Sequence, residues 1–469
     1  MFAKIQQIHF VGIGGIGMSG IAEVLLNLGY KISGSDLKSS GVTQRLAGLG
    51  ASIFEGHGAE NISGAEVVVT SSAISPENPE VVEAHRLHLP VIQRAEMLAE
   101  LMRLKYGIAI AGMHGKTTTT SMVAAVLAGG GLDPTVVVGG RVDAMGSNAR
   151  LGKSQYLVAE ADESDRSFLK LSPILSGVTN IDREHMDCYR NMRDVKNTFL
   201  EFMDRVPFYG MVVACNDDPV LRKLLPEVRR RTVTYGTRRG SDFLIKLRNG
   251  RAAMGAVSGP LSRFSVSYRE KDLGEFTLHV PGVHNILNAT AAIAVGVGLD
   301  VAVDAIRSGL DQFRGVDRRF QLRGRAAGVS VIDDYGHHPT EIKATLAAAR
   351  QCGFRKVHVV FQPHRYTRTR DLMEEFSNAF ADCDSLFVLD IYAASEKPME
   401  GISGEALARV IAEKSGKSAR YAASFAEAAS AAVGAAQDGD MILTMGAGNV
   451  SQLGPMILER LKELELSRG

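Results

Sequence analysis

The segment "AGMHGKTTTT" has the composition of a phosphate-binding loop. Gly112 and Gly115 allow a tight turn whose backbone N–H groups can bind phosphate. Lys116 can then reach the outer phosphates of a nucleotide, and the hydroxyl of Thr117 can coordinate Mg²⁺. The strict pattern requires glycine at position 110, where the chain has Ile110, so we expect a shorter variant of the loop. A glycine-rich turn that binds nothing is the weaker interpretation.

Two acid-rich segments follow predicted strands in the same part of the chain. The first, "EADESD", contains Glu160, Asp162, Glu163 and Asp165. The second, "TNIDREHMD", contains Asn180, Asp182, Glu184, His185 and Asp187. Carboxylate oxygens are preferred ligands of hard cations, so both segments fit a site for Mg²⁺ and phosphate. Solvated surface turns are the alternative interpretation of both.

A second glycine motif, "GIGGIG", follows an apolar run near the N-terminus. Gly12, Gly14 and Gly17 fit G-x-G-x-x-G, and Asp36 follows at the spacing of a dinucleotide-binding turn. Taken alone, this motif predicts an NAD(P)-dependent oxidoreductase. Two nucleotide loops in one chain instead favour an enzyme that uses ATP on a substrate that is itself a nucleotide.

These motifs need strands and helices that bring them together. Short apolar strands alternate with helical patterns along the chain, which predicts an α/β fold of three units with largely parallel sheets. We expect a Rossmann-like domain over 1–94, a central P-loop ATPase-type domain over 95–314 and a second Rossmann-like domain over 315–469. Residues 232–281 are rich in turns and strand-forming residues, and they predict a small antiparallel excursion on the central domain. Ligands of such sheets bind at the carboxyl ends of the strands.

The composition excludes several classes of protein. The 469 residues include 53 Lys and Arg and 52 Asp and Glu, so the formal net charge of +1 gives no reason to expect nucleic acid as a partner. No apolar stretch is long enough to span a bilayer, and the N-terminus lacks the pattern of a signal peptide. The four cysteines are isolated in the sequence, which is typical of reduced thiols. We therefore expect a cytoplasmic protein without a membrane partner.

The chain resembles the Mur ligases, a family of ATP-dependent, amide-forming ligases of bacterial peptidoglycan synthesis. Ten segments carry the resemblance in order along the chain: GIGGIGMSG, SSAI, GMHGKTTTT, EADESD, TNIDREHMD, PGVHNILNA, GVDRRF, DDYGHHPTE, FQPHRYTRTRDL and MGAGN. The resemblance implies that ATP phosphorylates the lactyl carboxylate of UDP-N-acetylmuramate. The amine of L-alanine then attacks the acyl phosphate, and ADP and phosphate are released. It also implies two Mg²⁺ ions, for which Mn²⁺ can substitute, and we expect a monomer or weak homodimer.

The same resemblance assigns roles to individual residues. Lys116 contacts the β- and γ-phosphates, Thr117 and Glu160 bind the Mg²⁺ of ATP, and His185 binds a second Mg²⁺. The expected ATP contacts are Gly112, His114, Gly115, Lys116, Thr117, Thr118, Asn285, Asn288, Arg319 and Asp334. The expected UDP-sugar contacts are Gly14, Gly15, Ile16, Gly17, Asp36, His57, Ser71, Ser72, Arg94 and Asn148. The expected contacts to the amino acid are Tyr335, His337, Arg365 and Arg368, because arginine binds carboxylate through two parallel hydrogen bonds.

One departure from the family pattern and three alternatives remain open. Met113 stands where the family usually has threonine, so we expect a modest shift in nucleotide affinity. A ligase that attaches a recycled tripeptide to the same UDP-sugar is the nearest alternative, although "FQPHRYTRT" is not expected in it. An NAD(P)-dependent oxidoreductase has no use for Glu160 or His185. A non-catalytic ATP switch is the remaining alternative.

Overall fold

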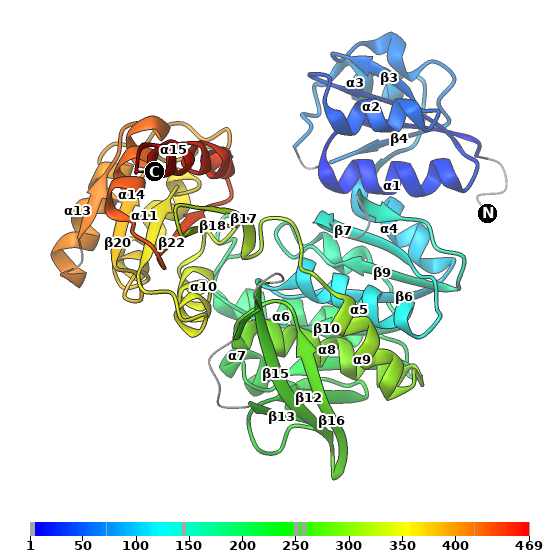
Figure 1. Cartoon of the computed structure of the whole chain (residues 1–469). Coiled ribbons are helices and arrows are strands. Elements are labelled where there is room, and N and C mark those ends of the chain that lie inside the picture. The colour runs from blue at the N-terminus through cyan, green and yellow to red at the C-terminus, as the bar shows by residue number, and fades with distance from the viewer. Residues whose placement is uncertain are drawn as a thin grey trace. The chain divides into compact units, whose positions relative to one another are not determined.

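The computed structural model describes residues 5–71, 73–142, 147–247, 253–255, 259–416 and 418–468. Three sheets flanked by helices confirm the predicted α/β class (Figure 1). The chain divides into two compact units. The first comprises Met1–Leu247, Phe264–Phe276 and Leu287–Phe313, and the second comprises Arg248–Arg263, Thr277–Ile286 and Arg314–Gly469. Across the described ranges, no helix is both long and apolar enough to cross a membrane.

The first sheet has five parallel strands in the order β3-β2-β1-β4-β5. Its strands are β1 (Gln7–Val11), β2 (Lys31–Asp36), β3 (Ser52–Glu55), β4 (Val67–Thr70) and β5 (Val91–Gln93). Its helices are α1 (Ile16–Asn27), α2 (Gly41–Gly48), α3 (Pro79–Arg86) and α4 (Arg94–Arg103). The strand order reverses at β1, so the glycine turn after β1 lies at the point where such sheets bind ligands.

The central sheet has β6 at its middle, between β9 and β10, and the order β14-β15-β13-β12-β11-β10-β6-β9-β7-β8, with β16 paired to β15. The strands are β6 (Tyr106–Ala111), β7 (Thr135–Val142), β8 (Ser147–Arg150), β9 (Tyr156–Glu160), β10 (Leu175–Val178), β11 (Met211–Cys215), β12 (Thr232–Gly236), β13 (Phe243–Leu247), β14 (Ala253–Gly255), β15 (Gly259–Tyr268) and β16 (Lys271–Leu278). The helices are α5 (Lys116–Gly129), α6 (Met192–Asp204), α7 (Pro219–Leu224), α8 (Val283–Gly298) and α9 (Val303–Gln312). The middle strands are continuous apolar runs, as expected where helices cover both faces of a sheet.

The antiparallel excursion over residues 232–281 is smaller than the sequence predicts. β12 pairs with β11 in parallel, and β13 pairs with β12 in parallel. Antiparallel pairing begins only between β13 and β15. The turn-rich composition predicts short strands correctly, but the direction of a strand depends on its partner and not on its own residues.

The third sheet has the order β17-β18-β22-β19-β20-β21, and only its edge strand β17 is antiparallel to its neighbour. The strands are β17 (Gln321–Ala326), β18 (Val329–Asp334), β19 (Val357–Phe361), β20 (Ser385–Val388), β21 (Ala419–Tyr421) and β22 (Met441–Met445). The helices are α10 (Pro339–Gln351), α11 (Tyr366–Asp371), α12 (Met373–Ser377), α13 (Gly404–Ser415), α14 (Phe425–Ala435) and α15 (Leu453–Arg468). The pattern over 370–381 predicts one helix, but the chain forms α11 and α12, which are separated at Leu372.

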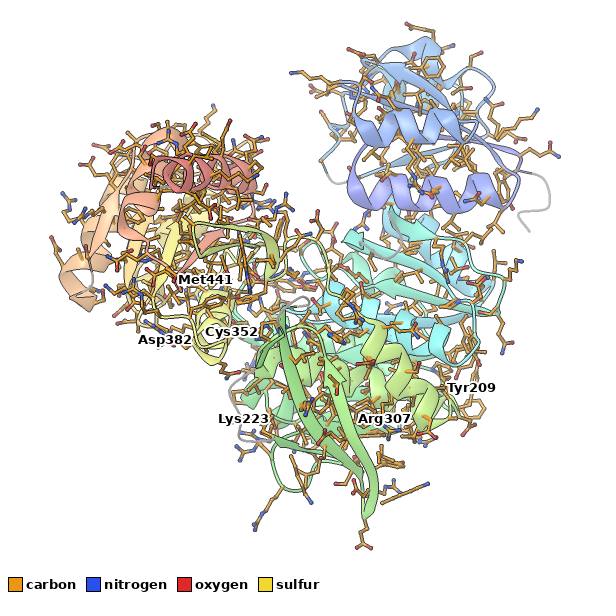
Figure 2. The ribbon with its side chains drawn as sticks, in the orientation of Figure 1. Tyr209, Lys223, Arg307, Cys352, Asp382 and Met441 are labelled. Carbon is orange, nitrogen blue, oxygen red and sulfur yellow. The ribbon has the colours of Figure 1, made fainter. Side chains whose placement is uncertain are left out.

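Two hydrophobic clusters fill the core around the third sheet. One includes Phe361, Phe376 and Met441, and the other includes Ile442 and Leu453. Met441 and Ile442 are consecutive residues of β22, so their side chains point to opposite faces of the sheet. Figure 2 labels Met441 among the side chains of this part of the chain. All four cysteines are free thiols, as the sequence predicts.

Candidate functional site

The phosphate loop joins β6 to α5 and depends on two glycines. Gly112 has φ +134°, and a Cβ atom there would lie 2.0 Å from Oγ1 of Thr179. Gly115 has φ +81°, and a Cβ atom there would lie 2.8 Å from Oδ1 of Asn288. Both positions therefore exclude a side chain. The resulting turn places the N-terminus of α5, with its free N–H groups, at the carboxyl end of β6.

Two polar residues after β10 hold the backbone of this loop. Asn180 accepts a hydrogen bond from the His114 N–H at 2.9 Å and donates one to the His114 carbonyl at 2.9 Å. The hydroxyl of Thr179 donates to the same carbonyl at 2.7 Å. The sequence placed Asn180 only among candidate metal-binding residues, and no sequence pattern indicates this contact with the loop backbone.

The ammonium of Lys116 donates three hydrogen bonds within the protein. Its acceptors are the carbonyls of Gly112 at 2.8 Å and Met113 at 3.3 Å, and Oε1 of Glu163 at 2.7 Å. Burial alone would lower the pKa of Lys116, but the carboxylates of Glu163 and Asp162 outweigh it and raise the pKa. The lysine is therefore firmly charged.

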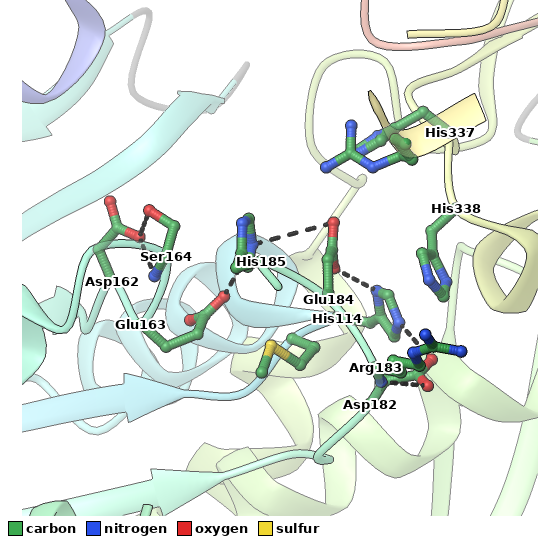
Figure 3. Close-up of polar contacts among 12 residues, drawn as sticks. His114, Asp162, Glu163, Ser164, Asp182, Arg183, Glu184, His185, His337 and His338 are labelled. Carbon is green, nitrogen blue, oxygen red and sulfur yellow. Dashed lines mark hydrogen bonds and ion pairs between the residues drawn. The ribbon is translucent and has the colours of Figure 1, made fainter. Parts of the chain in front are cut away.

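Glu163 is completely buried beside this lysine. Complete burial raises the pKa of Glu163, and the ammonium of Lys116 opposes that rise because it favours the charged carboxylate. Its Oε1 lies 3.6 Å from Nε2 of His185, while its Oε2 has no hydrogen-bond partner among the described residues (Figure 3). An orphaned carboxylate oxygen beside an imidazole fits the ligand chemistry of a divalent cation.

The three predicted metal ligands come from neighbouring elements. β6 pairs with β9 and with β10, and Glu160 is the last residue of β9, opposite Ile110 of β6. Thr117 lies in the first turn of α5, and His185 lies in the segment after β10, with φ +57°. The carboxyl ends of adjacent parallel strands thus bring a hydroxyl, a carboxylate and an imidazole to the same edge of the sheet.

The side chain of His114 is occupied by acidic partners. Its Nε2 lies 2.9 Å from Oδ2 of Asp182, and its Nδ1 lies 3.9 Å from Oε2 of Glu184 (Figure 3). Thr118 is buried in α5, with 6% of its surface exposed. The His114 N–H already donates to Asn180, so the expected contacts of His114 and Thr118 with ATP stay predictions.

The glycine turn of the first sheet is fixed by β2. The carbonyl of Ser35 accepts hydrogen bonds from the N–H groups of Gly12 and Ile13 at 2.8 and 2.9 Å. Oδ2 of Asp36 accepts one from the N–H of Gly14 at 2.8 Å. A pocket of about 220 Å³ lies beside this carboxylate. It is lined by Asp36, Lys38, Ser39, Thr43, Gln44, Ala47, Ile53, Phe54 and Glu55.

A buried carboxylate anchors His57, another predicted UDP-sugar contact. Nδ1 of His57 lies 2.9 Å from Oγ of Ser35 and 3.3 Å from Oε2 of Glu80. Ser35 and Asn61 each donate a hydrogen bond of 2.6 Å to Glu80. Burial alone would raise the pKa of Glu80, but the imidazole of His9 at 3.7 Å and hydrogen bonds from Ser35 and Asn61 outweigh it and lower the pKa to about 2. Glu80 is therefore a buried anion that ties β1, β2 and α3 together.

Arg94 lies between the glycine turn and the acid-rich segment after β9. Its Nη2 donates to Oδ2 of Asp162 at 3.1 Å. A Cβ atom on Gly17 would lie 2.9 Å from its Nη1, so the guanidinium packs against the first turn of α1. Among the other predicted UDP-sugar contacts, Ser71 is the first residue after β4. Ser72 and the side chains of Ile16 and Asn148 lie outside the described residues.

The predicted ATP contacts of the second unit bond within that unit. Asp334 accepts hydrogen bonds at 2.8 Å from the N–H groups of Phe320 and Gly336, and burial raises its pKa. Arg319 lies 3.3 Å from Glu341 and stacks over the ring of Tyr335 at 5.2 Å. Asn285, at the start of α8, donates to the carbonyl of Pro281 at 2.7 Å. Asn288 of the same helix belongs to the first unit, where it lies beside Gly115 of the phosphate loop.

The predicted amino-acid contacts of this unit gather around His364, a histidine to which the sequence motifs gave no role. The ring of His364 lies 5.7 Å from His337 and stacks on Tyr392 at 5.5 Å, and its Nδ1 is 3.2 Å from Nη1 of Arg368. His337 in turn meets the ring of Tyr335 edge-on at 5.5 Å. Burial, His337 and the nearby arginines lower the pKa of His364 to about 3, so its ring is neutral.

Arg365 adds a second guanidinium to this group. Its backbone has φ +70°, and its Nε is buried with no hydrogen-bond partner among the described residues. Two arginines beside a neutral histidine form a positive site that fits a small carboxylate. His364 lies within "FQPHRYTRT" and could have been selected from that motif, whereas nothing in the sequence around Tyr392 indicated it.

Comparison with known proteins defines the class of this protein. Family profiles match as follows: "Mur ligase family, catalytic domain" over residues 7–106, "Mur ligase middle domain" over 110–296, and "Mur ligase, glutamate ligase domain" over 318–448. The chain belongs to the Mur ligase family. Within it, the chain is 74% identical to the UDP-N-acetylmuramate–L-alanine ligase of Koribacter versatilis over 98% of each chain. It is 53% identical to the enzyme of that name from Syntrophus aciditrophicus, over 100% of this chain and 96% of the relative.

Solved structures agree with this placement. The UDP-N-acetylmuramate–alanine ligase of Thermotoga maritima superposes with a TM-score of 0.81 at 29% identity, covering 98% of this chain and 99% of that one. A murein peptide ligase of Psychrobacter arcticus superposes with a TM-score of 0.68 at 23% identity, covering 97% and 99%. The second likeness is evidence of a shared fold alone.

Proposed function

We propose that this chain is an ATP-dependent ligase that joins L-alanine to the lactyl carboxylate of UDP-N-acetylmuramate. The observation that carries the proposal is the phosphate loop with its charged Lys116, beside the acid-rich segments, in a chain 74% identical to a ligase of that name. The reaction passes through an acyl phosphate and releases ADP and phosphate. A carboxylate acylates amines poorly at neutral pH, and phosphorylation turns one of its oxygens into a good leaving group.

In this proposal the first unit binds the UDP-sugar and the phosphates of ATP. The glycine turn and Arg94 hold the diphosphate of the UDP-sugar, and the pocket beside Asp36 receives the nucleoside. Lys116 and the N-terminus of α5 hold the outer phosphates of ATP. Thr117, Glu160 and His185 would hold Mg²⁺, which supplies positive charge between the carboxylate and the triphosphate.

The second unit supplies the amino-acid site in this proposal. Arg365 and Arg368 bind the carboxylate of alanine, and Tyr335 and His337 border its small side chain. Neutral His364 adds no charge of its own, so the two guanidinium groups determine the charge of the site. We also propose a cytoplasmic location, where ATP and UDP-sugars are available, and a role in peptidoglycan precursor synthesis and so in cell shape and division. The oligomeric state, a monomer or weak homodimer, can be measured by light scattering.

An omission assay tests this function. The purified protein is incubated with UDP-N-acetylmuramate, L-alanine, ATP and Mg²⁺, and phosphate and the amide product are measured. We expect both only when all four are present, and phosphate release that ignores the sugar nucleotide contradicts the proposal. A murein tripeptide offered as a competing amine separates the alanine ligase from the recycling ligase, because the recycling enzyme would consume the tripeptide instead of alanine.

A further inference from the structure

Glu163 has no part in the reaction described above, although it contacts the lysine of the phosphate loop. An ammonium group has three N–H donors. All three donors of Lys116 are taken within the protein, by the carbonyls of Gly112 and Met113 and by Oε1 of Glu163. A phosphate oxygen can therefore bind this ammonium only by displacing one of the three acceptors.

Glu163 is the acceptor that a phosphate oxygen would replace. The two carbonyls are neutral and belong to the loop itself, whereas Glu163 comes from the segment after β9. Only Glu163 presents an anionic oxygen to Lys116, at 2.7 Å, as a phosphate would. The carboxylate thus competes with the outer phosphate for the same ammonium.

Displacement leaves Glu163 in an unfavourable state. Its side chain is 0% exposed, and its Oε2 already has no hydrogen-bond partner within the described part of the chain. The preceding residue, Asp162, carries a negative charge, and the incoming triphosphate is negative as well. A buried carboxylate without its cation is strongly destabilising. A divalent cation that arrives with the nucleotide would give Glu163 a positive partner in place of the ammonium of Lys116.

We propose that Glu163 is a positioning residue that holds Lys116 in the empty loop and makes nucleotide binding depend on a divalent cation. When the phosphate binds Lys116 in place of Glu163, a divalent cation would supply the positive charge that the carboxylate has lost. This inference rests on the proposed function, because it takes ATP as the ligand of the loop. The sequence placed Glu163 only among four acids that fit a Mg²⁺ site, and the family resemblance gave it no role of its own.

Equilibrium nucleotide binding tests the proposal without relying on turnover. The probe is adenylyl imidodiphosphate, an ATP analogue that resists hydrolysis, and its affinity is measured by calorimetry in EDTA and in saturating Mg²⁺. Glu163→Gln removes the charge with little change in shape. Asp165→Asn is the matched control, because it removes the same charge from the same segment at an exposed residue that bonds only to the Ser167 N–H in the contacts described.

We expect Glu163→Gln to bind the analogue about 10- to 100-fold more tightly than the wild type in EDTA. In saturating Mg²⁺ this difference should fall below about threefold, so that Mg²⁺ improves binding much less in the variant than in the wild type. Asp165→Asn should behave like the wild type in both conditions. The proposal is overturned if Glu163→Gln binds the analogue in EDTA no more tightly than the wild type. It is also overturned if Asp165→Asn tightens binding in EDTA as much as Glu163→Gln does.

Two further variants keep the test decisive. Glu163→Met fills a similar volume without charge, and it gives the same comparison if the glutamine variant does not fold. In a Lys116→Met background, Glu163→Gln should no longer improve binding in EDTA, because the competition for the ammonium is gone. An analogue that fails to bind the wild type even with Mg²⁺ contradicts the proposed function itself. Normal wild-type binding with no effect of Glu163 contradicts only this inference.

Discussion

At the phosphate loop, one partly buried ammonium group, that of Lys116, supplies the positive charge nearest to the predicted position of the outer phosphates. Lys116→Ala removes this charge while leaving the glycine turn and its clamp by Asn180 in place. We expect the rate of product formation at saturating substrates to fall roughly 10²- to 10³-fold, as when one preorganised donor to transition-state charge is removed. Steady-state assays of phosphate release measure this. A kcat within a factor of about three of the wild type would refute the role of Lys116.

The arginines after β19 allow a matched pair of substitutions. Arg365→Ala removes a guanidinium whose buried Nε has no hydrogen-bond partner in the described ranges. Arg370→Ala removes an exposed guanidinium that pairs with Asp371 in the same motif. We expect Arg365→Ala to raise the KM for alanine about 10- to 100-fold, the cost of a lost charged hydrogen bond. Arg370→Ala should leave this KM unchanged. Equal effects of the two variants would move the amino-acid site elsewhere.

The sequence could predict the types of residue in the candidate site but not their partners. Glycine, lysine and threonine in the loop follow from its chemistry, and they lie where the motif predicts. The contact between Lys116 and Glu163, by contrast, depends on the shape of the turn after β9. In that turn Asp162 accepts hydrogen bonds from the N–H and the hydroxyl of Ser164. That turn redirects the chain within a few residues, and four neighbouring acids give no indication of which one faces inward.

Between elements, the buried carboxylate of Glu80 links α3 to β1 and β2. Its pKa is lowered to about 2, below the ordinary value of 4.5, so the folded state favours the charged form. Its contribution to stability is therefore complete above about pH 4.5 and is lost as the pH falls towards 2. We expect Glu80→Gln to lower the stability of the first sheet by roughly 2–3 kcal/mol at pH 7.

Urea unfolding at pH 7, 5 and 3, followed by hydrogen exchange in peptides of β1 and β2, tests this expectation. The difference between wild type and Glu80→Gln should persist at pH 5 and shrink at pH 3. Glu83→Gln on the same helix is the control, because Glu83 pairs only with Arg86 at the helix surface in the contacts described. A difference that does not depend on pH would mean that Glu80 acts through its shape alone.

The elements themselves were predictable where the apolar pattern is strong. Parallel strands such as β4, β6 and β19 follow from their runs of valine, isoleucine and alanine. The parallel strand β21, with the sequence ARY, has no such run and was not predicted. The direction of β12 and β13 did not follow, because their alternation is the same in either direction. The break between α11 and α12 at Leu372, where φ is −117°, was also missed, since no proline or glycine marks it. Three of the six residues of β17 are exposed and two are arginines, so its sequence lacks the apolar run of a buried strand.

For the whole chain, the third sheet carries a core of its own. Both hydrophobic clusters around it are drawn entirely from residues 314–469, although its compact unit also includes residues 248–263 and 277–286. We expect a fragment of residues 314–469 to fold by itself and to unfold cooperatively on heating. Circular dichroism and calorimetry measure this. A fragment without a cooperative transition would show that the two shorter segments are required for its stability.

The clamp on the phosphate loop sets an order of events during synthesis on the ribosome. Asn180, which holds both the N–H and the carbonyl of His114, is translated 66 residues after it. β9 and β10, the two neighbours of β6, also follow the loop in the chain. A nascent chain that ends before β10 therefore carries the full "GMHGKT" segment without the side chains that fix its shape. We expect the emerging polypeptide to acquire nucleotide affinity only after the ribosome has released the segment beyond β10.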